Sequence, residues 1–206
     1  MKPDPPSPLQ TTASTLSVAI TGGIGAGKSS ALAAFARHGA ATASADDLVH
    51  DLLRDDPEVL QKLVDRFGPA VIGQDGGADR EAIARIVFED PVELSWLERL
   101  LHPKVIEAQA AWRDGLAARP DPPHVVVTEV PLLFETGGDK RFDVVIVITA
   151  SPDIRAARRA VADSREARLL SEEEKIRRAD FAYVNDGTLE ELDAFVAGVV
   201  ESLSSS

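Results

Sequence analysis

The sequence predicts an α/β fold built on a parallel sheet, and three observations lead to this prediction. A glycine-rich stretch, residues 21–30, lies between a short apolar segment, residues 16–20, and a helix-forming segment that begins near Lys28. Near-continuous apolar runs at 125–129 and 144–148 are typical of strands covered on both faces. Helix-forming segments separate these runs, which is the order in which parallel strands are connected.

The glycine-rich stretch has the spacing G-x-x-x-x-G-K-[ST] of a phosphate-binding loop. Its glycines let successive N–H groups point at one anion, and the helix that follows adds its positive dipole end. We expect Lys28 to reach the β- and γ-phosphates of a nucleotide and the Ser29 hydroxyl to bind Mg²⁺. The alternative is a turn that merely joins a strand to a helix. The predicted nucleotide-binding residues of the loop are Gly23, Ile24, Gly25, Ala26, Gly27, Lys28, Ser29 and Ser30.

The composition limits the classes of function. The 206 residues suit one domain, and an apolar fraction of 44% is enough for a sizeable core. A net charge of −12 argues against general binding to nucleic acid or to an anionic membrane, so an anionic substrate needs a local positive site. The lack of cysteine removes disulfides and thiol catalysis and fits a cytoplasmic location. There is no run of 18 apolar residues, so we expect no membrane span.

Changes in residue pattern divide the chain into parts. Residues 1–15 are rich in proline and are expected to be a disordered N-terminal extension. The core of the sheet is expected from residues 16–45, 120–150 and 181–206. Residues 46–119 form an all-helical insert that is too long for a simple crossover, and we interpret it as a cap over the ligand edge of the sheet.

Two acids follow a short second strand that is predicted over residues 40–43. Ligands bind at the carboxyl ends of strands in open α/β sheets, so Asp46 is a candidate general base. Capping of the next helix, residues 48–54, is the other role, and we favour it for Asp47. Glu129 ends the strand 125–129, where an acid can hold Mg²⁺ through water.

The insert contains two further candidate residues. His102-Pro103 is expected to end one helix, and a new helix is expected from Lys104. His102 either satisfies a buried hydrogen bond or positions the acceptor. Arg80 is either a surface partner of Asp79 or a contact for an acceptor phosphate.

Residues 151–180 hold eight of the 22 Lys and Arg residues of the chain, together with seven acids. They form either helices with ordinary surface ion pairs or a mobile lid that brings arginines onto phosphates. Arg158 is the first lid candidate, whereas Arg165 and Arg168 are weaker ones. The chain is then expected to end with a strand at 181–184, a turn at Asn185, and a helix that Thr188 caps.

This order of elements is that of small kinases of the nucleoside-monophosphate type, a three-layer P-loop fold with a helical acceptor-binding insert and a lid. Over residues 18–203 the chain resembles the dephospho-coenzyme A kinase family. The matching segments are, in order, the loop 21–29, Ala45-Asp46, Asp79-Arg80, Val87-Phe88, Leu97-Glu98, His102-Pro103, Pro131-Leu132-Leu133-Phe134-Glu135, Phe142-Asp143, Glu174-Lys175, Ala179-Asp180-Phe181 and Asn185.

The resemblance implies transfer of the γ-phosphoryl group of ATP to the 3′-hydroxyl of dephospho-coenzyme A, the final step of coenzyme A biosynthesis. Asp46 and Lys28 are the catalytic candidates, and Mg²⁺ is expected on Ser29 and Glu129. Arg158 and Asn185 join the nucleotide-binding residues. The partners are then ATP and dephospho-coenzyme A, without nucleic acid or membrane, and the chain is expected to be a monomer or a weak homo-oligomer. The acceptor-binding candidates are Asp46, Arg80, His102, Pro131 and Leu132.

The sequence departs from the family pattern in two ways. An Asp-Ala-Asp triplet of the family is Ser44-Ala45-Asp46 here, and Ser44 could bind a water or the metal through its hydroxyl. The lid is shorter by roughly one helix of about ten residues. A kinase for another small acceptor and a nucleotide-binding switch or impaired binding protein are the competing interpretations. Against a guanine-reading switch, no Asn-Lys-x-Asp sequence follows a strand.

Overall fold

The computed structural model describes residues 15–158 and 170–205. One sheet contains five parallel strands in the order β2-β3-β1-β4-β5. Their bounds are β1 Leu16–Thr21, β2 Ala41–Ser44, β3 Val125–Glu129, β4 Val144–Thr149 and β5 Phe181–Val184. The α-helices are α1 Lys28–Arg37, α2 Ala45–Asp55, α3 Pro57–Phe67, α4 Arg80–Glu89, α5 Pro91–Ala117, α6 Pro152–Ala157, α7 Glu172–Arg178 and α8 Leu189–Ser204, and the short 3-10 helices are η1 Pro69–Val71 and η2 Gly138–Arg141. The predicted parallel α/β fold is confirmed.

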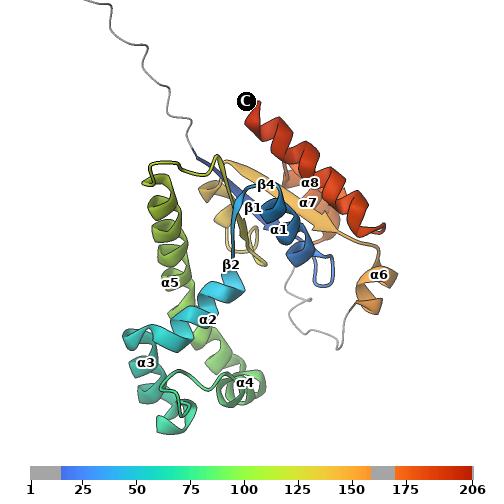
Figure 1. Cartoon of the computed structure of the whole chain (residues 1–206). Coiled ribbons are helices and arrows are strands. Elements are labelled where there is room, and N and C mark those ends of the chain that lie inside the picture. The colour runs from blue at the N-terminus through green and yellow to red at the C-terminus, as the bar shows by residue number, and fades with distance from the viewer. Residues whose placement is uncertain (1–14, 159–169, 206) are drawn as a thin grey trace, which may run out of the picture.

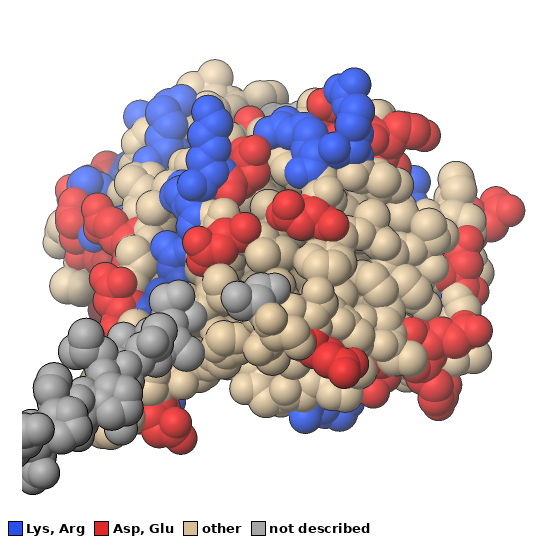
Figure 2. Space-filling view, turned by 90° about the horizontal axis from the view of Figure 1, so that it is seen from above, with Lys and Arg blue, Asp and Glu red and all other residues tan. Residues whose placement is uncertain are grey.

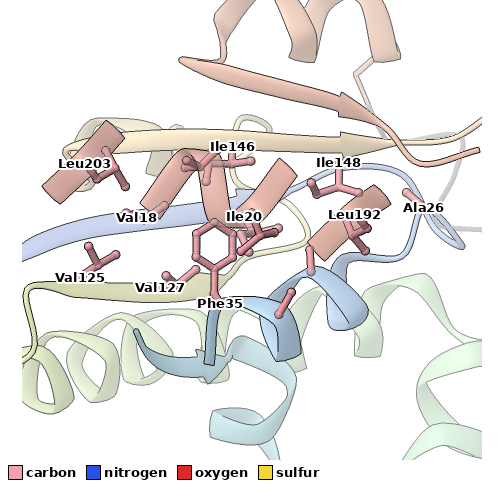
Figure 3. Close-up of a cluster of buried hydrophobic side chains, with 14 residues drawn as sticks. Val18, Ile20, Ala26, Phe35, Val125, Val127, Ile146, Ile148, Leu192 and Leu203 are labelled. Atoms are coloured by element: carbon pink, nitrogen blue, oxygen red, sulfur yellow. The ribbon is translucent and has the colours of Figure 1, made fainter. Parts of the chain in front are cut away.

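The strands alternate their side chains between two faces, and this alternation builds three layers. Val18 and Ile20 of β1 join a core that includes α1 and α8, whereas Ala19 belongs to a cluster on the opposite face. Figure 1 shows α1 and α8 side by side over one face of the sheet. Phe35 of α1 is fully buried, and Figure 3 shows its ring among side chains of the strands. The strands are therefore held in place by α1 and α8 on one face and by the segment that follows β3, with Leu133 and Phe134, on the other.

A second hydrophobic cluster lies within the helical insert. Helices α2 to α5 and the short η1 contribute its buried members, and Figure 1 shows α2, α3 and α4 in a lobe beyond β2. The buried residues of this cluster are Leu53, Val59, Leu63, Val71, Ile83, Val87, Leu100 and Leu101. None of them belongs to the clusters on the two faces of the sheet. The insert therefore has its own packed interior beside the sheet.

The predicted helix break at His102-Pro103 is wrong, because α5 runs without interruption through both residues. Proline has no N–H to donate, so Pro103 removes one hydrogen bond to the carbonyl of Arg99. On either side of it, Leu101 and Val105 remain buried. This tertiary packing outweighs the local cost of proline within the helix.

Parts of two predicted segments lie outside the described residues. The expected extension 1–15 is described only at Thr15, and residues 159–169 of the expected lid are not described, including Arg165 and Arg168. At the C-terminal end, the capping prediction is confirmed. The Thr188 side chain accepts a hydrogen bond from the N–H of Glu191, whose carboxylate accepts one from the N–H of Thr188.

Figure 2 shows how charge is distributed on one face of the molecule. Acidic side chains are spread across this face, and the Lys and Arg side chains gather mostly in the upper half of the view. Positive charge is therefore local on this face, although the net charge of the chain is −12. No helix in the described parts of the chain has the length and apolar character needed to cross a bilayer.

The burial of Phe35 leads to a test of the packing between α1 and the sheet. The substitution Phe35→Ala should lower the free energy of unfolding by about 3–5 kcal/mol, because it removes a ring from a closely packed core. The substitution Phe88→Ala is the control, since Phe88 is 71% exposed, and it should change the free energy by less than about 0.5 kcal/mol. Urea unfolding measures both values. Equal losses in the two variants would contradict the packing described for α1.

Candidate active site

The phosphate loop connects β1 to α1, and its shape depends on glycine. Gly22 has a φ of 144°, and a Cβ there would collide with the carbonyl oxygen of Ile148 in β4. Gly27 has a φ of 94° and is the N-cap of α1. The free N–H groups of the first turn of α1 therefore begin where the loop ends, which is the arrangement that binds phosphate.

Lys28 is buried at the start of α1, and its ammonium group donates a hydrogen bond to the carbonyl of Gly23 at 3.0 Å. Burial lowers the pKa of Lys28, and the negative charge of Glu129 opposes this effect. The charge of Lys175 lowers the pKa further, whereas Asp46 and Glu172 raise it. An anion bound at the loop would favour the charged form of Lys28.

Ser29 and Glu129 form the candidate Mg²⁺ site. The Ser29 hydroxyl donates to a carboxylate oxygen of Glu129 at 3.4 Å, and Glu129 is only 7% exposed. Burial raises the pKa of Glu129, Lys28 lowers it, and the nearby charge of Asp46 raises it again. The described residues include no cluster of three or more potential metal-binding side chains. Mg²⁺ that is bound to a nucleotide does not need such a cluster, because it keeps several waters and takes only one or two protein ligands besides phosphate oxygens. The Ser29 hydroxyl and the Glu129 carboxylate fit this requirement.

Asp46 lies in the first turn of α2, close enough to the loop for its charge to act on both Lys28 and Glu129. The Ser44 hydroxyl caps this helix by accepting a hydrogen bond from the N–H of Asp46 at 3.1 Å. The prediction that Asp47 caps a helix over residues 48–54 is therefore wrong. The β2 strand continues to Ser44, opposite Glu129 in the pairing with β3, and the helix begins at once.

Asn185 follows β5 and supports the loop from beside Gly27. Its side chain is buried, and its amide donates to the carbonyl of Ala26 at 2.8 Å. A Cβ on Gly27 would collide with this amide. Asn185 was predicted among the nucleotide-binding residues, and the contact in the structure is with the backbone that surrounds the nucleotide site.

Helices α6 and α7 also approach the phosphate loop. The backbone of Arg155 lies against Gly25, and the guanidinium of Arg158 lies beside Gly27. Arg155 is within 3.7 Å of the Glu172 carboxylate, which also accepts a hydrogen bond from the Thr149 hydroxyl. The structure thus brings the predicted Arg158 to the loop together with Arg155.

The predicted acceptor residues do not form a single contact cluster. Pro131 lies beside the end of β1, where the Thr21 hydroxyl donates to its carbonyl at 3.4 Å, and Leu132 follows it half-buried. The exposed Arg80 contacts the ring of His50 at 3.0 Å, from α4 to α2. His102 is exposed on α5, so the alternative of a buried hydrogen bond is wrong.

Three groups near this site were not predicted. His50 is one helical turn after Asp46, a spacing that could have indicated a shared face of α2. Glu172 approaches the loop from α7, and no local pattern indicates this contact. Lys175 was counted among the basic residues of the predicted lid and within the family resemblance, but its environment was not predicted: it is fully buried and paired with Glu135 at 3.1 Å.

Solved structures share this fold. A crystal structure of a protein from Thermus thermophilus is 33% identical to this chain and superposes with a TM-score of 0.74 over 92% of this chain and 98% of that one. The dephospho-CoA kinase from Campylobacter jejuni has a TM-score of 0.68 at 24% identity, over 92% of this chain and 97% of that one, which supports the fold alone. With a phosphate loop between the first strand and the first helix of a parallel sheet, the chain has the P-loop kinase fold.

Sequence comparison identifies the family. The family described as dephospho-CoA kinase matches residues 16–191. A dephospho-CoA kinase from Chlorobaculum tepidum is 37% identical over 204 residues, which cover 91% of this chain and 95% of that protein. The chain belongs to the dephospho-CoA kinase family.

The raised pKa of Glu129 predicts how stability depends on pH. Above the ordinary pKa of a glutamate, near 4.5, the folded protein holds the Glu129 proton more strongly than the unfolded chain does, so the free energy of unfolding falls as the pH rises through the raised pKa of Glu129. Glu129→Gln removes this titration. Relative to the parent, the variant without ligands should become progressively more stable as the pH rises from about 4.5 through the raised pKa of Glu129.

Urea unfolding at several pH values measures this difference. Glu201→Gln, at an exposed position of α8, is the control and should follow the parent at each pH. If Glu129→Gln also follows the parent, the Glu129 carboxylate does not have the environment described.

Proposed function

We propose that this chain transfers the γ-phosphoryl group of ATP to the 3′-hydroxyl of the dephospho-coenzyme A ribose, which gives coenzyme A and ADP and completes coenzyme A biosynthesis. The observation that carries this proposal is the extent of the family match, residues 16–191. The match includes the phosphate loop, the whole helical insert, α6 and α7. A match to the loop alone would have left the acceptor open, because many acceptors are served by one fold.

The phosphate loop and Lys28 would hold the donor. Backbone N–H groups of the loop and of the first turn of α1 bind the phosphates, and Lys28 follows the charge of the γ-phosphoryl group. Arg158, beside Gly27, is a further cation for the same phosphates. Mg²⁺ bound with ATP would be held by Ser29 and Glu129 and would add positive charge beside the β- and γ-phosphates.

Asp46 would act on the acceptor. As the ribose oxygen forms its bond to the γ-phosphorus, the bond from that phosphorus to the β–γ bridging oxygen breaks, and Asp46 accepts the hydroxyl proton. The Ser44 cap fixes the backbone at Asp46, and the charge of Asp46 acts on Lys28 and Glu129. These contacts support a carboxylate at the boundary between the donor site and the insert.

The remaining roles belong to the same proposal. The insert, residues 46–119, would bind the acceptor, with Arg80, His102, Pro131 and Leu132 as contacts. Residues 151–180 would cover the phosphates as a lid. ATP and dephospho-coenzyme A are proposed as the substrates because of the family match, and a cytoplasmic location is proposed because the chain lacks cysteine. The chain is proposed to be a monomer or a weak homo-oligomer.

An assay of ADP production tests the proposed reaction. Purified protein with Mg²⁺ and ATP should release ADP when dephospho-coenzyme A is added, and the product should be coenzyme A by mass spectrometry. Adenosine monophosphate and shikimate are control acceptors and should not stimulate release. Stimulation by a control acceptor but not by dephospho-coenzyme A would overturn the proposal.

Asp46→Asn tests the general base. It keeps the shape of the side chain and removes the base, so turnover should fall by roughly 10²–10⁴-fold while ATP affinity changes little. Asp47→Asn is the matched control on the same helical turn and should lose far less. Steady-state kinetics and nucleotide titration measure both. Equal losses in the two variants, or a loss of ATP affinity in place of turnover, would exclude Asp46 as the base.

A further inference from the structure

Lys175 is a buried cation that the proposed mechanism does not use. Its side chain has 0% exposure, so its charge is fully removed from water. A charge so deeply buried needs a strong partner, because desolvation costs several kcal/mol per ion. In the described part of the chain, the nearest opposite charge is a carboxylate oxygen of Glu135 at 3.1 Å.

This ion pair leaves donors and acceptors unsatisfied. The pair is close, but the geometry at the Lys175 ammonium does not form a hydrogen bond, and no other described group accepts one. The paired oxygen of Glu135 already accepts a hydrogen bond from the N–H of Leu170 at 3.0 Å. The second oxygen of Glu135 also has no partner among the described residues. The pair is therefore weaker than a buried structural salt bridge needs to be.

Lys175 lies near the phosphate loop. Helix α7 approaches the loop at Gly23, whose carbonyl accepts the hydrogen bond of Lys28, and the charge of Lys175 is among those that lower the pKa of Lys28. Three residues before Lys175 on α7, Glu172 lies against Gly23 of the loop. Two buried like charges repel unless an anion lies near both, and the anion for which this loop is built is a polyphosphate.

We propose that Lys175 supplies a second fixed positive charge to the phosphate-binding site and attracts the polyphosphate of the bound nucleotide through space. The inference rests on the proposed function and adds to it a residue from α7. Lys28 would bind the phosphates directly, whereas Lys175 would act from the side of α7. A fixed buried charge needs no rearrangement when the nucleotide binds.

The structure offers a matched ion pair as a control. Arg178, also on α7, pairs with Asp139 at 2.9 Å and lies over the ring of Phe134 at 4.4 Å. This pair joins the same helix to the same segment after β3. Arg178 is not among the largest influences on the pKa of Lys28, whereas Lys175 is.

The test removes both charges of the buried pair at once. Lys175→Met/Glu135→Gln leaves no unpaired buried charge and keeps an acceptor for the N–H of Leu170, so urea unfolding should stay near the parent. The affinity for ATP, measured by calorimetry without acceptor, should fall about tenfold. Affinity for ADP should fall less, because a fixed charge acts more strongly on the more highly charged nucleotide. The control Arg178→Met/Asp139→Asn should bind both nucleotides within about twofold of the parent, as expected for a partly exposed pair.

The proposal would be overturned if the Lys175→Met/Glu135→Gln variant bound ATP as tightly as the parent does, or if it lost affinity for ATP and ADP equally. The pair would then have a structural role. Glu135→Gln alone is a second variant, which should keep or increase ATP affinity because the cation remains. A loss of ATP affinity there as large as in the double variant would also overturn it. Since these titrations need no acceptor, they remain valid if the parent fails to phosphorylate dephospho-coenzyme A, so the two failures are distinguishable.

Discussion

The backbone contact between Gly22 and Ile148 sets the position of the whole phosphate site. Without a Cβ, the chain leaving β1 can run against β4 before it turns into α1. This close approach fixes where α1 starts, and therefore where Lys28 and Ser29 lie. Ser29 is then within reach of Glu129, because β1 and β3 are neighbours in register. The shape of the loop and the positions of Lys28 and of the candidate metal ligand Ser29 thus depend on one steric constraint between adjacent strands.

Electrostatic balance is the second property of the site. Burial disfavours the charged forms of both Lys28 and Glu129. The pKa of Lys28 is therefore lowered, and the pKa of Glu129 is raised. A polyphosphate with its cation would restore both charged forms. Without a nucleotide, the charged forms of Lys28 and Glu129 lack the partners that would compensate for their burial. Such a site favours a ligand that carries charge of its own.

Local signals were enough to predict the strands, the phosphate loop and the Thr188 cap, since each depends on residues adjacent in the chain. Apolar runs bounded by turns indicate buried strands, and glycine spacing indicates the loop. The continuity of α5 could not be predicted, because the packing of Leu101 and Val105 overrides the proline signal. The Ser44 cap was missed because the strand and the helix follow each other without a loop. Lys175 and Glu135 are 40 positions apart, and no local pattern joins them.

The uninterrupted α5 gives the molecule a mechanical property. From Pro91 to Pro103 the helix is a rod of about 18 Å, at 1.5 Å per residue. The lost hydrogen bond at Pro103 makes that turn the most compliant point of the rod. A bend of about 10° there would carry the far end by about 3 Å, by the arithmetic of a lever. At the other end, Arg113 ties the helix to the carbonyl of Arg141, just before β4. Helix α5 is therefore an arm that is tied to the sheet side of the molecule at Arg113 and is most compliant near Pro103, so a small bend there would shift the outer helices of the insert relative to the sheet.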